Sequence, residues 1–391
     1  MSSYPIITLR PHADQRVRRG HAWIFSNELR DGFQEFASGA LVQVQDNRGG
    51  VIGTGTLNPH SLIAVRLLSR DAVIVDRAFL YAQADAALKL RAQLLHDLTA
   101  CRVVFSESDG LPGLILDKFG DVLVYQSLTA GMEQLMPHLL DWMRERFAPR
   151  VIVEANDSQA RVLEGLPQVR RCVEGTLDDL VEFTQDNLQL LADPLHGQKT
   201  GFFLDQRLNR LRLQSFLRGG ERLLDLFSYS GGFGLYALHG GAGHVTFVDA
   251  STPALQLCTD AARRNGFAER VETIEADIFE WVKNCTDQFD VACLDPPALA
   301  KSRSKAAAAV RGYRDLNARA LKLVKPGGLF ATSSCSGLVT PLKWREALEE
   351  AAFKSRRRVR FIAFGSQAPD HPVLTAMPET EYLKFAIAVV E

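Results

Sequence analysis

Four aspartates and one cysteine stand at the ends of hydrophobic runs that have the composition of buried strands. They are Asp225, Asp249, Asp277, Asp295 and Cys335, in that order along the chain. Carboxylates can bind ammonium and hydroxyl groups or move protons, and a thiolate is a strong nucleophile. An acid at a strand end is often only a cap or turn former, but four of them in order favour a binding site.

The elements that must position these side chains alternate between strand and helix from about residue 188. Strands are expected at 222–228, 244–250, 271–277, 289–297 and 328–336, and helices at 231–238, 252–266 and about 306–325. Alternation of this kind predicts a doubly wound parallel α/β sheet, in which ligands bind beyond the carboxyl ends of the strands. Thr252-Pro253 is a helix start with Thr252 as the expected cap. Segments 358–365 and 382–390 could pair as two antiparallel strands at the end of the domain.

A glycine-rich turn, Ser230-Gly231-Gly232-Phe233-Gly234, follows the first of these strands. Glycines let the backbone approach a ligand closely because they carry no Cβ. The same turn also fits the dinucleotide fingerprint G-x-G-x-x-G/A, ending at Ala237 and with Asp249 as the ribose acid. On the glycines alone, a nicotinamide cofactor is therefore not excluded.

Three features favour S-adenosyl-L-methionine over a dinucleotide. Asp225 precedes the glycines, where a carboxylate would bind an ammonium group and would repel a pyrophosphate. Asp249 can accept both ribose hydroxyls, and Asp277 with Ile278 and Phe279 can hold an adenine amine and ring. This arrangement matches the Rossmann-like sheet of class I methyltransferases.

Asp295-Pro296-Pro297-Ala298 resembles the D/N-P-P-Y/F motif of amino methyltransferases, but Ala298 replaces the aromatic residue that stacks on the target base. Methylation of an exocyclic amine is therefore disfavoured. Cys335 lies at the same predicted edge, and a thiolate that adds to C6 of a pyrimidine turns C5 into a nucleophilic enamine carbon. Asp295 can assist by protonating N3. These two residues predict methylation at C5.

The other cysteines carry no comparable signal. Cys258 and Cys293 fall within a helix and a strand and are interpreted as buried hydrophobic residues. The six cysteines form no C-x-x-C pair, which argues against a metal site and a disulfide framework and favours a cytoplasmic location. No run is long and apolar enough to span a membrane.

The charge pattern permits an RNA partner without requiring one. The formal net charge is −1. Arginines gather at Arg10, Arg16, Arg18 and Arg19, and a second basic run covers 354–360. Each run could contact phosphates or could simply be a solvated face.

Composition shifts divide the chain into three expected domains. Residues 1–72 have the alternation and turns of a small β-rich module, 73–187 have the pattern of an α+β unit, and 188–391 form the parallel sheet.

Long segments of the chain resemble the RlmI-type 5-methylcytosine methyltransferases of large-subunit ribosomal RNA. The segment RRGHAWIFSNEL resembles the family's PUA-like RNA-binding domain, and SESDGLPGLILDKFGD resembles its central domain. The methyltransferase domain is represented by DPLHGQKTGFFLDQR, DLFSYSGGFG, DPPALAKS, GYRDLNARALKLVKPGG, SSCS and DHPVL…PETEYLK. The resemblance covers nearly the whole chain.

The resemblance implies roles for individual residues, a large-subunit ribosomal RNA substrate and a homodimer. Cys335 would be the nucleophile, with Asp295 beside it. Together with the residue interpretation, it gives this expected cofactor-binding set: Lys199, Phe203, Arg207, Asp225, Phe227, Ser228, Tyr229, Gly231, Gly232, Asp249, Ala250, Ser251, Asp277, Ile278, Phe279, Asp295 and Pro296. Other RNA cytosine methyltransferases carry a second cysteine where this chain has Ala298, so the base for the elimination step is open among Asp295, Lys301 and water.

Two other functions stay open at this point. Uracil C5 would be methylated by the same thiol chemistry, and the residues do not distinguish a carbonyl from an amine at C4. A non-catalytic RNA-binding ribosome-assembly factor could also keep the cofactor as a structural ligand, although the intact Cys335 and strand-end acids argue against it.

Overall fold

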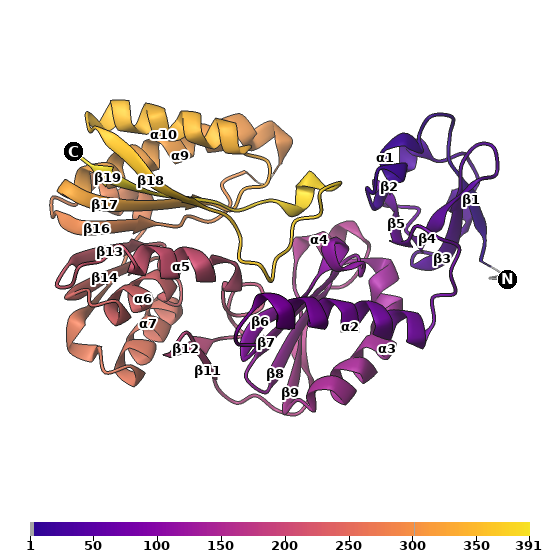
Figure 1. The fold of residues 1–391 in the computed structure, drawn as a ribbon, viewed down its shortest axis with the longest axis horizontal. Coiled ribbons are helices and arrows are strands. Elements are labelled where there is room, and N and C mark those ends of the chain that lie inside the picture. Colours follow the sequence, from indigo (N-terminus) through magenta and orange to yellow (C-terminus); the bar gives the residue numbers. More distant parts are fainter. Residues whose placement is uncertain (1–3, 301) are drawn as a thin grey trace. The chain divides into compact units, whose positions relative to one another are not determined.

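The computed structural model describes residues 4–300 and 302–391, which form two compact units (Figure 1). Unit 1 contains the chain up to Phe183 together with Ala192–Phe202 and Pro369–Thr380. Unit 2 contains Thr184–Leu191, Phe203–Ala368 and Glu381–Glu391. The predicted domain boundaries at 72 and 187 stay a prediction, because the two compact units are each assembled from several separate segments of the chain.

The first part of unit 1 is a five-stranded sheet with strand order β1-β3-β4-β5-β2. Its strands are β1 (Ile6–Thr8), β2 (Trp23–Phe25), β3 (Ala40–Gln45), β4 (Val51–Leu57) and β5 (Ile63–Ser69), and the short helix α1 is Gln15–Arg18. Asp46 closes the β3–β4 turn, because its Oδ1 accepts the N–H groups of Arg48 and Gly50 at 2.8 Å each. The turn signal in the sequence therefore has a direct structural cause.

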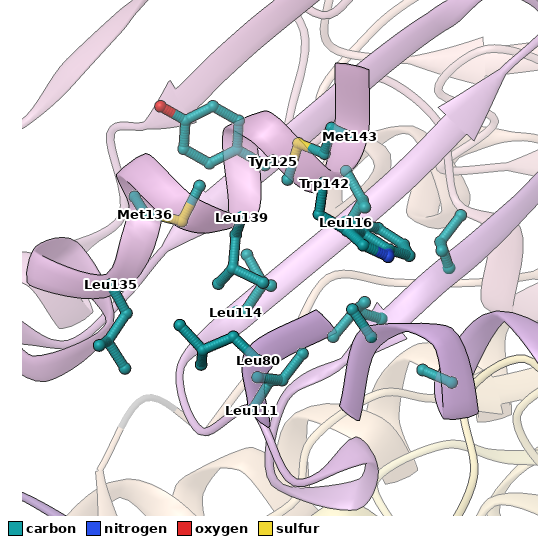
Figure 2. Close-up of a cluster of buried hydrophobic side chains, with 14 of the residues drawn as sticks. Leu80, Leu111, Leu114, Leu116, Tyr125, Leu135, Met136, Leu139, Trp142 and Met143 are labelled. Carbon is teal, nitrogen blue, oxygen red and sulfur yellow. The ribbon is translucent and has the colours of Figure 1, made fainter. Parts of the chain in front are cut away.

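A second five-stranded sheet, with order β10-β9-β8-β7-β6, follows in unit 1. Its strands are β6 (Ala100–Phe105), β7 (Leu114–Phe119), β8 (Val122–Ser127), β9 (Val151–Asn156) and β10 (Val169–Glu174), and its helices are α2 (Arg77–Leu94), α3 (Ala130–Phe147) and α4 (Gln159–Leu163). Asp76 caps α2 and Thr129 caps α3 through side-chain oxygens that accept N–H groups. Figure 2 shows the core between helix and sheet, where Trp142 and Leu139 of α3 lie beside Leu116 and Leu114 of β7.

A hairpin of β11 (Val181–Gln185) and β12 (Leu188–Ala192) follows the second sheet. Its turn residues Asp186 and Asn187 have φ of 52° and 66°, as a two-residue hairpin turn requires. The turn brings Asp186 into unit 2, where it contacts a predicted site residue.

Unit 2 is built on a seven-stranded sheet with order β15-β14-β13-β16-β17-β19-β18. Its strands are β13 (Arg222–Leu226), β14 (His244–Asp249), β15 (Val271–Glu275), β16 (Phe289–Leu294), β17 (Val324–Ser334), β18 (Val359–Gly365) and β19 (Lys384–Val390). Neighbours from β15 to β17 are parallel, and β19 is antiparallel to both β17 and β18. The predicted Rossmann-like sheet and the antiparallel pairing of its last two strands are confirmed.

Six helices cover this sheet: α5 (Arg207–Gln214), α6 (Gly232–His239), α7 (Thr252–Arg264), α8 (Ile278–Asn284), α9 (Ala306–Ala320) and α10 (Pro341–Ser355). α5, α6 and α7 lie on one face, and α9 and α10 lie on the other (Figure 1). Buried residues such as Leu224, Leu294 and Phe330 form the core beneath them.

Three details differ from the sequence prediction. The prediction of Thr252 as the cap of α7 was wrong, because the Ser251 hydroxyl accepts the Ala254 N–H and Thr252 is already helical. α9 ends at Ala320 in a 3₁₀ turn instead of reaching 325. The helix α10 was not predicted, although Thr340 caps it and Pro341 begins it.

Within residues 4–300 and 302–391, no helix has the length and apolar character needed to cross a membrane. The same residues hold no cluster of three or more His, Cys, Asp or Glu side chains that could bind a metal ion.

Candidate active site at the carboxyl edge of the unit 2 sheet

The parallel strands of unit 2 bring five predicted site residues to one edge of the sheet. Asp225 is the second-last residue of β13 and Asp249 the last of β14, while Asp277, Asp295 and Cys335 follow β15, β16 and β17. The strands are in register, with Leu226 paired to Val248 and Leu294, so their carboxyl ends are level. Ligands bind at this edge in doubly wound sheets.

The turn after β13 has an unusual backbone. Phe227 and Tyr229 have φ of 61° and 46°, which costs free energy in residues other than glycine, and Gly231 follows with φ of 78°. The conformation is held because the Tyr229 N–H donates to Asp249 Oδ2 at 2.9 Å. A Cβ on Gly234 would lie 2.3 Å from the ring of Phe247, so this glycine lets α6 pack against β14.

Asp225 is buried below this turn, and its Oδ2 accepts the Gly234 N–H at 2.9 Å. Burial raises the pKa of Asp225 to about 7, with Asp295 adding to the rise and Arg210 opposing it. A carboxylate in this environment is stabilised by a further cation. The observation fits the ammonium group of S-adenosyl-L-methionine better than a pyrophosphate.

Asp249 and Asp277 are both oriented by backbone N–H groups. Asp249 Oδ1 accepts the Ser251 N–H at 3.0 Å, so both of its oxygens are fixed and each keeps a lone pair for a ribose hydroxyl. Asp277 caps α8, with its Oδ1 accepting the Phe279 N–H at 2.8 Å.

Aromatic rings lie beside these acids. Phe227 and Phe279 meet edge to face with ring centroids 5.8 Å apart, and 39% of Phe279 is exposed. Phe203 meets Tyr229 in the same way at 5.2 Å. Ile278 is buried, Ala250 is exposed, and Ser228 is buried within the turn. Apolar surface of this kind suits an adenine ring.

Asp295 is half-buried and lies between two hydrogen-bond donors from other parts of unit 2. Gln206 Nε2 donates to its Oδ2 at 3.0 Å, and the Ser333 hydroxyl donates to its Oδ1. Burial raises the pKa of Asp295, and Asp205 adds to the rise, while both donors oppose it. A carboxyl group with a raised pKa can act as a proton donor near neutral pH.

Cys335 follows Ser334, the last residue of β17, and is half-buried. Its thiol donates weakly to the carbonyl oxygen of Pro296 at 3.9 Å, which places it beside the turn that begins at Asp295. By contrast, Cys258 and Cys293 are buried and burial raises the pKa of both thiols, as expected for inert cysteines.

Two of the residues implied by the resemblance have partners that the sequence did not indicate. Arg207 forms a two-point ion pair with Asp186, at 3.0 and 2.7 Å, and Asp186 also accepts the Tyr236 hydroxyl at 2.6 Å. Lys199 lies in unit 1, with φ of 51° and its carbonyl oxygen accepting Arg170 at 2.8 Å. Lys301, one candidate for the elimination base, lies outside the described residues.

Sequence reasoning also missed Gln206, Ser333 and Arg210. All three lie near Asp295: Gln206 and Ser333 bond it, and the buried Arg210 guanidinium opposes the rise in its pKa. Gln206 directly precedes Arg207, so the segment DPLHGQKTGFFLDQR was the available signal.

Two family models match the chain. A PUA-like domain matches residues 7–70, and an S-adenosylmethionine-dependent methyltransferase matches residues 171–377.

Curated relatives match over nearly the full length. Ribosomal RNA large subunit methyltransferase I of Vibrio cholerae is 37% identical, over 99% of this chain and 100% of the relative. The protein of that name from Shewanella denitrificans is 36% identical, over 98% and 99% respectively.

Solved structures share the fold. A SAM-dependent methyltransferase candidate from Streptococcus mutans has a TM-score of 0.84 at 20% identity, covering 98% of this chain and 100% of that one. A methyltransferase candidate in complex with SAH has the same TM-score at 19% identity, covering 98% and 99%.

Proposed function

Because the chain belongs to the S-adenosylmethionine-dependent methyltransferase family and to the group of ribosomal RNA large subunit methyltransferase I, we propose that it methylates C5 of cytosine in large-subunit ribosomal RNA. The proposal includes a covalent step in which Cys335 adds to C6 of the base. Asp295 is its proposed proton donor.

One observation carries the C5 chemistry. The Cys335 thiol and the half-buried Asp295 carboxyl group stand at the ends of neighbouring parallel strands. Asp295 is bonded to Ser333, and Cys335 to the carbonyl oxygen of Pro296. A pyrimidine C5 reaction needs a nucleophile for C6 and a proton donor for N3 at the same time. These two residues supply one group of each kind.

The strand-end acids are the proposed cofactor contacts. Asp225 would hold the ammonium group because it is buried and a cation would stabilise its charge. Asp249 would hold the ribose hydroxyls, and Asp277 with Phe279 the adenine, because backbone N–H groups fix the carboxylate oxygens of both acids. When bound, S-adenosyl-L-methionine supplies the electrophilic methyl group.

The chain's own residues act on the base. Addition of the Cys335 thiolate forms an S–C6 bond and moves electrons through C5 and C4 to N3, which takes a proton from Asp295. C5 is then an enamine carbon. After C5 gains its methyl group, N3 returns its proton to Asp295. A base (water, Lys301 or Asp295) then takes the C5 proton, the C5–H electron pair forms the C5–C6 double bond, and the S–C6 bond breaks with its electron pair returning to sulfur.

The test uses the purified protein, labelled S-adenosylmethionine and large-subunit ribosomal RNA that lacks modifications. Label recovered in 5-methylcytidine after digestion is the expected result. Label in 5-methyluridine would replace cytosine by uracil as the substrate, and label in an exocyclic amine would overturn the C5 chemistry.

A second experiment tests the covalent step directly. In RNA that carries 5-fluorocytidine the C5 proton is replaced, so elimination stops and the S–C6 adduct accumulates. We expect a denaturation-resistant protein–RNA complex with wild-type protein and none with Cys335→Ala. If cofactor binds but neither product nor adduct forms on RNA or on large-subunit particles, the assembly-factor function would be favoured instead.

A further inference from the structure

Lys384, the first residue of β19, is a buried cation next to the proposed nucleophile. Only 7% of it is exposed. It pairs across the sheet with Ser334, the residue before Cys335. Its Nζ donates to the carbonyl oxygens of Ser336 at 2.6 Å and Tyr382 at 2.8 Å. The ammonium group is therefore fixed to the backbone of Ser336, the residue after the thiol, and to that of Tyr382.

A buried ammonium group is costly, and two neutral carbonyl oxygens offset only part of that cost. Burial lowers the pKa of Lys384 to about 8, while Cys335 and then Glu381 oppose the fall. Glu381 is exposed, so water screens its charge. Of these two groups, Cys335 opposes the fall more strongly, so a thiolate there would stabilise the ammonium group.

Two further titratable groups lie near the thiol among the described residues, and neither is a cation. Tyr313 on α9 donates to or accepts from the Ser336 hydroxyl at 2.9 Å, and burial raises the pKa of Tyr313, which keeps it neutral. Asp295 is bonded to Ser333, two residues before the thiol, and its pKa is also raised by burial. A nearby cation favours a thiolate, whereas these two groups do not.

We propose that Lys384 is a positioning residue that holds Cys335 as a thiolate through its fixed ammonium charge. The inference rests on the proposed function, in which sulfur must be an anion both when it attacks C6 and when it leaves. On addition the thiol proton has already gone to solvent, and on elimination the electron pair returns to a sulfur that Lys384 stabilises.

The test measures the rate of alkylation of Cys335 by iodoacetamide against pH, resolved by mass spectrometry of the Cys335 peptide. In the wild-type protein the rate should reach half its maximum below about pH 8.5, the ordinary value for a thiol. Lys384→Met should move that midpoint up by about one pH unit or more, and Lys384→Arg should leave it low. Half-buried Cys285 in the same samples is the control, and its curve should not move.

An unchanged midpoint in folded Lys384→Met would overturn the proposal. If that variant does not fold, a wild-type midpoint at or above about pH 8.5 would do so. Alkylation needs neither RNA nor methyl transfer. If the wild-type alkylation midpoint is low but no 5-methylcytidine forms in the methylation assay, only the proposed function is rejected. If 5-methylcytidine forms but the alkylation midpoint has the ordinary value for a thiol, only the role of Lys384 is rejected.

Discussion

Ser333, near the end of β17, donates its hydroxyl hydrogen to the Asp295 carboxyl group that follows β16. The two residues are 38 positions apart in the sequence, and the parallel pairing of Leu294 with Thr332 brings them together. The bond stabilises the ionised form of Asp295 and so limits the rise in its pKa.

Ser333→Ala should therefore raise the pKa of Asp295 further. If protonated Asp295 is the donor to N3, activity falls as pH rises through that pKa, so the alkaline limb of kcat/KM should move to higher pH in the variant. Ser334→Ala is the matched control, because the Ser334 hydroxyl accepts the Ser336 N–H instead. An alkaline limb that stays in place would separate Asp295 from the proton transfer.

Cys335→Ala should lose methyl transfer by at least about 1000-fold, because the variant removes the thiol that is proposed to add to C6. Its affinity for S-adenosylhomocysteine, measured by calorimetry, should change by no more than about twofold. Cys285→Ala, which removes a half-buried thiol elsewhere in unit 2, should keep full activity. Full methylation by Cys335→Ala would end the covalent mechanism.

Asp225→Asn should stabilise the cofactor-free protein above neutral pH. An unfolded aspartate titrates near about pH 3.9, whereas folded Asp225 titrates at about 7, so the folded state binds the extra proton between these values. This group therefore makes stability fall as pH rises from about 4 to about 7, by up to about 1.4 kcal/mol per pH unit.

The measurement compares the melting temperatures of wild type and Asp225→Asn from pH 5 to pH 8 without cofactor. The melting temperature of the variant should rise relative to that of wild type as pH rises. The variant should also bind S-adenosylhomocysteine at least about tenfold more weakly. Asp290→Asn is the control, because Lys325 and the Arg222 N–H lower the pKa of Asp290 against the effect of burial and keep it ionised from pH 5 to pH 8. Its melting temperature should therefore lie below that of wild type by a similar amount at every pH in this range. A parallel pH dependence in wild type and Asp225→Asn would contradict the prediction.

Arg91→Met should destabilise unit 1 by about 3–5 kcal/mol, because it leaves the buried Asp109 carboxylate without its cation. The side chains of this pair are 0% and 2% exposed, and Arg91 also donates to the carbonyl oxygen of Asp370 at 2.8 Å. The urea midpoint followed by circular dichroism measures the loss. Arg77→Met breaks an exposed ion pair with Glu145 and should cost less than about 1 kcal/mol.

The parallel sheet of unit 2 was predictable because its strands are short hydrophobic runs separated by Gly, Pro and Asp. The same local signals predicted which acids stand at the strand ends. α10 was not predicted, although Thr340-Pro341 is a cap and start of the expected type.

The partners of the site residues could not be predicted, since tertiary pairing brings them together. Gln206 reaches Asp295 from 89 positions away, and Asp186 reaches Arg207 from a hairpin turn. Lys384 gave no local signal at all, because a lysine at the start of a strand is usually solvated. Only the register of β19 against β17 shows that it lies beside Cys335.

The chain moves between its two units five times, after residues 183, 191, 202, 368 and 380. Two short segments, Ala192–Phe202 and Pro369–Thr380, belong to unit 1, although the methyltransferase family model covers the first and most of the second, up to residue 377. Thr200 bonds Asp117 at 2.5 Å, and the Asp370 carboxylate accepts the Arg102 N–H at 3.0 Å. A protein shortened to begin at residue 188 would therefore expose two segments that normally pack against residues 4–183. Loss or exchange of those residues in evolution would require new sequences in both segments.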